Sequence, residues 1–210
     1  MQFSEYQTAA EKHLKACKAI LNMLATENFN KLLRDKDRNL LLMDIYYLSG
    51  YIFECVITYG IYKKAFDFHQ IEFETVITEN IKNKNIFGNG GAYYHNPPNI
   101  YFAFYPKYNP KLHLSLSQTP LHSTNYCVNG HKFWKNIELL HLILSGNTIP
   151  LISNYDDTSL NPEILELYRL VRDWEPEKRY LIEDPPFTIA QITNLLNLAE
   201  KVYLGVIKNI

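Results

Sequence analysis

Cysteine is scarce in this 210-residue chain, and the three that occur, Cys17, Cys55 and Cys127, lie far apart in the sequence. Disulfide-stabilised domains are small and rich in closely spaced cysteines, so the sequence excludes that class and suits a reducing compartment. Net charge is also nearly absent, with a formal value of −1 at pH 7. No overall electrostatic field therefore draws the protein toward nucleic acid or acidic membranes.

No targeting segment is expected either, because the N-terminus has neither the basic start nor the apolar run of a signal peptide. The most hydrophobic stretch, residues 40–62, approaches the length that spans a membrane. It contains Asp44, Glu54 and several tyrosines, which are unfavourable in hydrocarbon or prefer the membrane interface. We therefore expect a buried central helix rather than a membrane span, and a cytoplasmic protein with no membrane partner.

Apolar side chains are plentiful. They make up 47% of the chain, which includes 16 tyrosines and 11 phenylalanines. This composition supports a packed core and is not that of a disordered protein. The length favours one core that carries an insertion. We predict a single, mainly α-helical domain over residues 1–210, an up-and-down bundle with an aromatic and proline-rich insertion at about 86–130.

Helical periodicity is clear from the N-terminus onward. Ser4 and Gln7 match a capping box at a helix start. The polar residues 28–39, which include the charged run 34–38, are expected to form a solvated connection, with or without a helical turn. The apolar residues that follow the helical period of the first helix are Phe3, Tyr6, Ala10, Leu14, Cys17, Leu21 and Leu24.

The next predicted helix, at about residues 40–66, is apolar nearly all round, which places it at the centre of the fold. It contains Gly50 and Gly60. Glycine costs about 1 kcal/mol relative to alanine inside a helix, and close approach of another helix is the simplest compensation. A short helix at 71–82 is also expected.

Helix starts are distinct in the C-terminal part of the chain. Residues 161–163 place an N-cap asparagine, a proline and an acid in the order that opens a helix, which should run to Arg172 or Asp173. Another helix is expected at about 130–145, and residues 188–191 match a second capping box. The apolar face of the last helix comprises Ile192, Leu195, Leu196, Ala199, Val202, Tyr203 and Val206.

The segment between residues 80 and 137 contains no Asp or Glu, whereas its six lysines give it a formal charge of +6. Prolines and glycines interrupt it, so we expect a loop or hairpin with a strand at 100–105. Its aromatic rings, interleaved with Lys107 and Lys111, could stack bases while the lysines neutralise phosphates. Alternatively, these rings pack a small β excursion onto the bundle or form a homodimer interface. They are Tyr93, Tyr94, Tyr101, Phe102, Phe104, Tyr105 and Tyr108.

One face of the central helix carries polar groups, since Tyr47, Tyr51, Glu54 and Thr58 recur at helical spacing. A carboxylate in so apolar a helix is unfavourable unless a donor pairs with it. We expect Glu54 to meet an arginine of the later helical region or a tyrosine hydroxyl across the bundle. Such a pair is either purely structural or part of a site.

Three segments carry a further pattern. Residues 46–55 (YYLSGYIFEC) are rich in tyrosine and contain a glycine and a glutamate; residues 130–134 (GHKFW) open a helix with a histidine. Residues 174–180 (WEPEKRY) follow one helix and precede the last. In these features the chain resembles the HEPN family, the nucleotide-binding helical domains of higher eukaryotes and prokaryotes. The resemblance covers about residues 1–80 and 130–210.

The resemblance implies an up-and-down bundle of four to five helices, frequently dimeric, in proteins of RNA cleavage, toxin–antitoxin pairs or phage defence. The family's ribonuclease motif is an arginine followed by a histidine after four to six intervening residues, and no arginine of this chain has a histidine at that distance. Metal-independent RNA cleavage needs a base of near-neutral pKa and a cation for the phosphorane. Arginine cannot act as the base, so a histidine from elsewhere, such as His131, would have to replace it.

The candidate site follows from these considerations. No cofactor is expected, because the chain has no phosphate loop and no dinucleotide-binding glycine pattern. No metal is expected either, since the spacing of the histidines and cysteine at 113–131 matches no zinc pattern. The catalytic candidates are Arg172, Arg169, Glu54 and His131. The substrate-binding candidates are Arg179, Tyr180, Tyr47, Tyr51, Lys107 and Lys111.

The leading interpretation is a homodimeric, HEPN-like protein that associates with RNA or belongs to a defence or toxin–antitoxin system. Its usual ribonuclease site would be lost or rearranged, which leaves open whether it is an enzyme. The alternative is a non-catalytic protein-interaction module that works with a nucleotidyltransferase or another partner.

Overall fold

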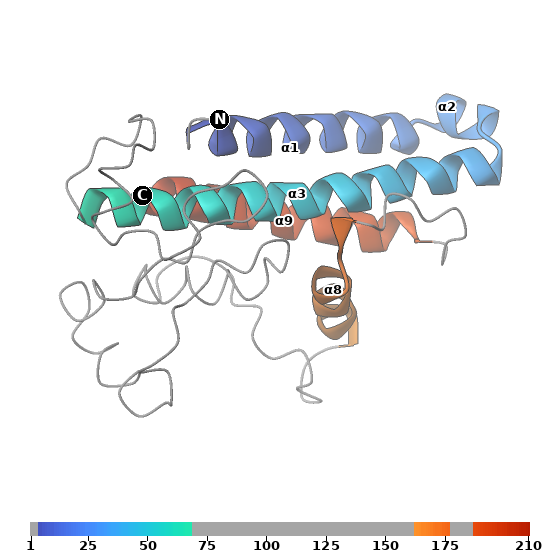
Figure 1. Ribbon diagram of the computed structural model, residues 1–210. Helices are drawn as coiled ribbons and strands as arrows, with labels where there is room; N and C mark the ends of the chain where they lie inside the picture. Colours follow the sequence, from blue (N-terminus) through green and yellow to red (C-terminus); the bar gives the residue numbers. More distant parts are fainter. Residues whose placement is uncertain (1–3, 69–161, 177–186) are drawn as a thin grey trace.

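The computed structural model describes residues 4–68, 162–176 and 187–210 (Figure 1), and the elements in these ranges are all α-helices. The predicted mainly helical fold is confirmed for this part of the chain. The predicted helices at 71–82 and 130–145, the insertion at 86–130 and its strand lie outside the described residues. The helices are α1 (Ser4–Ala25), α2 (Glu27–Leu32), α3 (Asp35–Phe68), α8 (Pro162–Arg172) and α9 (Ile189–Asn209).

Three long helices form a layered bundle with α3 at its centre (Figure 1). Helix α1 runs antiparallel to α3, and α9 lies along both of them. The Lys18 Nζ of α1 meets a carboxylate oxygen of Glu200 in α9 at 2.5 Å, an ion pair on the surface of the bundle. The shorter α8 lies beside α9 and runs across the direction of the other helices.

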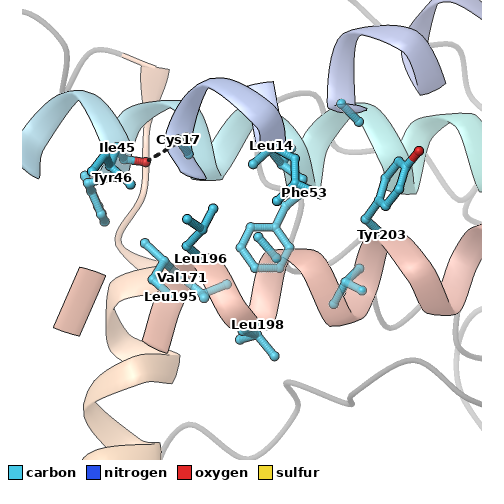
Figure 2. Close-up of a cluster of buried hydrophobic side chains, with 14 of the residues drawn as sticks. Leu14, Cys17, Ile45, Tyr46, Phe53, Val171, Leu195, Leu196, Leu198 and Tyr203 are labelled. Carbon is cyan, nitrogen blue, oxygen red and sulfur yellow. Dashed lines mark hydrogen bonds between the residues drawn. The ribbon is translucent and has the colours of Figure 1, made fainter. Parts of the chain in front are cut away.

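Helix α3 forms the core because it buries side chains on both its α1 and its α9 side. Leu14 of α1 lies beside Phe53 of α3, Leu198 of α9 lies below Phe53, and Tyr203 of α9 stands to the right of it (Figure 2). By length and hydropathy, Asp35–Gly60 could cross a membrane, but 61% of its most apolar window is buried inside the protein. This burial agrees with the expected central helix.

The residues at the turn between α1 and α3 differ from their prediction. The expected solvated connection over 28–39 is wrong, because α2 covers Glu27–Leu32 and α3 already begins at Asp35, which leaves residues 33–34 as the link. Acidic residues in a first turn favour helix formation through the helix dipole. Arg34 and Arg38 also pair with Asp37 and Asp35, each at 2.8 Å and three residues apart. The charged run therefore starts a helix.

The start of α9 agrees with the sequence. Thr188 Oγ1 accepts a hydrogen bond from the backbone N–H of Gln191 at 3.2 Å, and the Gln191 side chain accepts one from the backbone N–H of Thr188 at 2.7 Å. This reciprocal pair is the predicted capping box. The predicted apolar face of α9 is confirmed as well, since all seven of its residues are buried. Local pattern thus determines both the beginning and the orientation of this helix.

Candidate functional site

The end of α8 is held against α3 by one aromatic side chain, Trp174. Its side chain is buried, with 3% of its surface exposed, and its indole N–H donates a hydrogen bond to the carbonyl oxygen of Tyr47 at 3.1 Å. Nearby, the hydroxyl of Tyr46 donates to the carbonyl oxygen of Leu170 at 3.0 Å. We call this contact, formed by Tyr46, Tyr47, Gly50, Leu170 and Trp174, the Trp174 joint.

Gly50 is the residue that admits the indole. A methyl group on its Cα would overlap Cε2, Nε1 and Cδ2 of Trp174. Another group does approach this glycine closely, but it is the Trp174 side chain that follows α8, and not a second helix as expected. No water-sized space remains where Gly50, Phe53, Val171 and Trp174 meet. Tight packing at this point offsets the low helix propensity of glycine.

A row of aromatic rings continues from the joint across α3 to α1. The ring of Tyr51 lies edge-on to Trp174, with centroids 5.3 Å apart, and 6.0 Å from the imidazole of His13 in α1. Tyr47 packs edge-on to Tyr51 at 4.9 Å, and its hydroxyl donates to the Tyr51 hydroxyl at 3.0 Å. We call His13, Tyr47, Tyr51 and Trp174 the aromatic row. Three segments distant in sequence therefore meet here.

His13 is the member of the row that sequence reasoning missed. Burial is the main cause that lowers the pKa of its imidazole below the ordinary 6.5, and the charge of Lys12 lowers it further. The imidazole is half-buried, and its surroundings favour the neutral form. The only sign of His13 in the sequence was its position beside Leu14, which belongs to the buried stripe of α1. A histidine at such a position is more typically a structural residue.

Glu54 lies on α3 three residues after Tyr51, on the side of the helix that carries the two tyrosines. It is half-buried and so is not in open solvent. Thr58, the last member of the predicted polar face, is buried with 3% of its surface exposed. The pairing of Glu54 with an arginine or a tyrosine hydroxyl stays a prediction.

The two arginines of α8 lie in its last turn, at the negative end of the helix dipole. Arg172 is two residues before Trp174, and its Nε donates to a carboxylate oxygen of Asp173 at 3.0 Å. The Asp173 carboxylate offsets part of the positive charge of Arg172. Arg169 is exposed. Arg172 is therefore the arginine that lies next to the joint in the sequence, whereas Arg169 is five residues before Trp174.

Several predicted site residues lie outside the described part of the chain. These are His131, Lys107 and Lys111 in the central segment, and Arg179 and Tyr180 after the joint. The described residues therefore bring together Tyr47, Tyr51 and the end of α8.

The described residues contain no cluster of three side chains of the kinds that bind metal ions. Cys17 and Cys55 are buried thiols, and burial raises the pKa of each to about 12. The Cys17 thiol donates a weak hydrogen bond to the carbonyl oxygen of Ile45 at 3.9 Å (Figure 2). A buried thiol with so high a pKa is a poor nucleophile, so these two cysteines act in packing.

Comparison with known proteins adds no assignment to this geometry. No family model matches the chain, and neither a curated protein nor a solved structure is significantly similar to it.

Proposed function

We propose that this chain is a HEPN-like, RNA-associated protein of the defence or toxin–antitoxin type, whose usual ribonuclease site is lost or rearranged. The supporting observation is the Trp174 joint. Two of the three segments that carry the resemblance, residues 46–55 and the segment that begins at Trp174, contact each other through the hydrogen bond between Trp174 Nε1 and the Tyr47 carbonyl. The joint brings the end of α8, with Arg172, to the tyrosine-bearing region of α3.

The chemistry of RNA cleavage decides what this site needs. Breaking the chain without a metal requires a cation that stabilises the charge on phosphorus and a base that accepts the proton of the 2′-hydroxyl. Arg172 supplies a guanidinium that stays charged at every physiological pH. Tyr47 and Tyr51, each half-buried, place amphipathic rings on the same side of the bundle.

The test measures RNA binding and cleavage by the purified protein at two salt concentrations, with a chelator present. Arg172→Ala is compared with Arg34→Ala, which removes an exposed arginine just before the start of α3. We expect chelator-resistant cleavage that falls at least tenfold in the Arg172 variant and is unchanged in the Arg34 variant. Binding without cleavage indicates a lost site. A chain that neither binds nor cleaves RNA contradicts the proposal.

A second candidate function rests on a different surface. Three large apolar side chains are exposed where α1, α2 and α3 meet: Met23 at 48%, Leu32 at 84% and Leu40 at 45%. Exposed apolar side chains are typical of protein contacts where they form a continuous patch. They favour the alternative of an interaction module for a nucleotidyltransferase-type partner. Co-purification with a nucleotidyltransferase encoded next to this chain, lost in Leu32→Glu, is the expected result.

The homodimer is part of the same proposal. Leu204 of α9 is 55% exposed and Met23 of α1 is 48% exposed, so the first and last helices both present apolar groups to solvent. Light scattering should give twice the mass of one chain. A monomer at micromolar concentration would contradict the dimer.

A further inference from the structure

A hollow lies where α8 passes the first turns of α9, and Leu170 of the joint forms part of its wall. Its volume is about 260 Å³. One water molecule occupies roughly 30 Å³, whereas a pocket that encloses a whole drug-sized ligand holds roughly 300–1,000 Å³. The hollow is therefore large enough for one long side chain and too small for most complete ligands. We call it the α8–α9 groove.

The wall of the α8–α9 groove combines apolar groups with negative charge. Leu167 and Leu170 of α8 are half-buried apolar side chains. Glu163 and Glu166 of the same helix are exposed carboxylates, and no described residue of the wall is a lysine, an arginine or a histidine. The N-termini of α8 and α9 each add about half a positive charge, so roughly one net negative charge remains. A cationic group on an aliphatic stem therefore fits both parts of the wall.

The groups that would recognise such a side chain are held in place by their neighbours. One carboxylate oxygen of Glu166 accepts a hydrogen bond from Gln191 Nε2 at 2.6 Å, and Gln191 is fixed in turn by the capping box with Thr188. The carbonyl of Leu170 accepts the hydrogen bond from the Tyr46 hydroxyl. A carboxylate accepts several hydrogen bonds, so Glu166 can bind a further donor. A wall that is already positioned loses less conformational entropy on binding.

We propose that the α8–α9 groove binds an arginine side chain of a partner protein. The guanidinium meets the carboxylates of Glu163 and Glu166, and the aliphatic part of the side chain packs on Leu167 and Leu170. Arginine fits better than lysine because its planar group presents several donors in a fixed fork that matches carboxylates. Ile164, one turn before Leu167 on α8, is 41% exposed and offers an apolar contact to the residue beside that arginine.

The partner chemistry follows from this wall. The partner is a protein that presents an arginine flanked by apolar residues, since the groove is lined by carboxylates and leucines. The α8–α9 groove lies outside the aromatic row, and the inference does not rest on RNA association.

The experiment measures the binding of fluorescein-labelled peptides to the full chain by fluorescence anisotropy. The probe is an eight-residue peptide that carries one arginine between two leucines in a glycine–serine sequence, with both ends blocked. Two matched peptides replace the arginine with lysine or with citrulline, which has the shape of arginine and no charge. We expect lysine to weaken binding about threefold and citrulline at least about tenfold, because charge-assisted hydrogen bonds to carboxylates are lost.

The matched variants place the binding in the groove. Glu163→Gln combined with Glu166→Gln removes both charges and keeps an acceptor for Gln191. It should weaken the arginine peptide at least about tenfold and leave the citrulline peptide unchanged. The control is Glu27→Gln, an exposed glutamate of α2, which should bind all three peptides as wild type does. The thermal midpoint of each variant shows whether the fold is retained.

The opposite outcomes would overturn the inference. Equal binding of the arginine and citrulline peptides to wild type would exclude recognition of charge, whatever the folding of the variants. Equal weakening in Glu27→Gln would indicate a general electrostatic attraction in place of a site. Free arginine amide that binds as tightly as the peptide would indicate a small-molecule site. No binding at millimolar peptide would exclude the groove as a docking site.

Discussion

The Trp174 joint, within α3, and the N-terminal end of α3 are built in contrasting ways. At the joint, one indole is 97% buried against a glycine, and its only polar atom is hydrogen-bonded to the Tyr47 carbonyl. At the start of α3 and the turn before it, which we call the hairpin tip (residues 23–40), charged side chains pair with neighbours on the same helix while Leu32 is 84% exposed. The hairpin tip therefore has more ion pairs than the joint, whereas the Trp174 side chain at the joint is more deeply buried.

We expect burial to contribute more to the stability of the fold than the number of interactions does. Exposed ion pairs contribute about 0–1 kcal/mol each because water and salt screen them. A fully buried aromatic side chain contributes several times more. We therefore expect substitutions at the joint to destabilise the fold strongly and those at the tip to have little effect.

The largest effect is expected for Trp174→Ala. Removing this buried ring leaves a cavity against α3 and should lower the free energy of unfolding by about 4 kcal/mol. Urea denaturation gives the value. Trp174→Phe keeps an aromatic ring at this position and should lower the free energy of unfolding by less. If Trp174→Ala unfolds at the wild-type midpoint, α8 is not held to α3 in the way described.

The next effect is expected for Gly50→Ala, because its methyl group has no room beside the indole. Overpacking of this kind should destabilise the protein by about 2 kcal/mol. In a Trp174→Ala background, the same change should become neutral or stabilising, because alanine is the better helix former by about 1 kcal/mol. A double-mutant cycle tests this change of sign. Equal effects in both backgrounds would show that the two residues are not coupled.

An intermediate effect is expected at the start of α9, where Thr188 and Gln191 satisfy each other's backbone donors. Thr188→Ala should lower the free energy of unfolding by about 1 kcal/mol. Thr188→Ser keeps the capping hydroxyl and should retain most of the stability that the cap provides. Thermal denaturation monitored by circular dichroism distinguishes the two variants. Indistinguishable midpoints would indicate that the cap contributes nothing.

The smallest effect is expected at the tip. Lys31 pairs with Glu27 four residues earlier, and both side chains are more than two thirds exposed. Lys31→Ala should change the free energy of unfolding by less than about 0.5 kcal/mol, and salt should reduce even that. A loss as large as that of Thr188→Ala would contradict the contrast between the two regions.

Local sequence patterns predicted much of the fold. The buried face of α9, its capping box and the end of α8 at Arg172 agree with the structure, because helical period and end chemistry depend only on neighbours in sequence. The charged run 34–38 was misjudged because a set of exposed charges is typical of both loops and first turns. The i, i+3 pairing that favours the helix is visible in the sequence once a helix is assumed.

The candidate site was less accessible to sequence reasoning. Tyr47, Tyr51 and Glu54 were found from their spacing on one helix. His13 was missed because the ring beside it belongs to another helix. The lowered pKa of its imidazole depends on burial, which no local pattern describes.

The sequence alone determined that this protein is mainly helical in the described ranges, which sides of α1 and α9 face inward and where α8 ends. Each of these properties depends on residues within one or two helical turns. Only the tertiary structure decided that Trp174 fills the space at Gly50 and donates to Tyr47, a residue 127 positions away. It also decided that His13 joins the tyrosines of α3. Such contacts depend on how three helices pack together, because shape and burial are properties of the assembled core and not of any single segment.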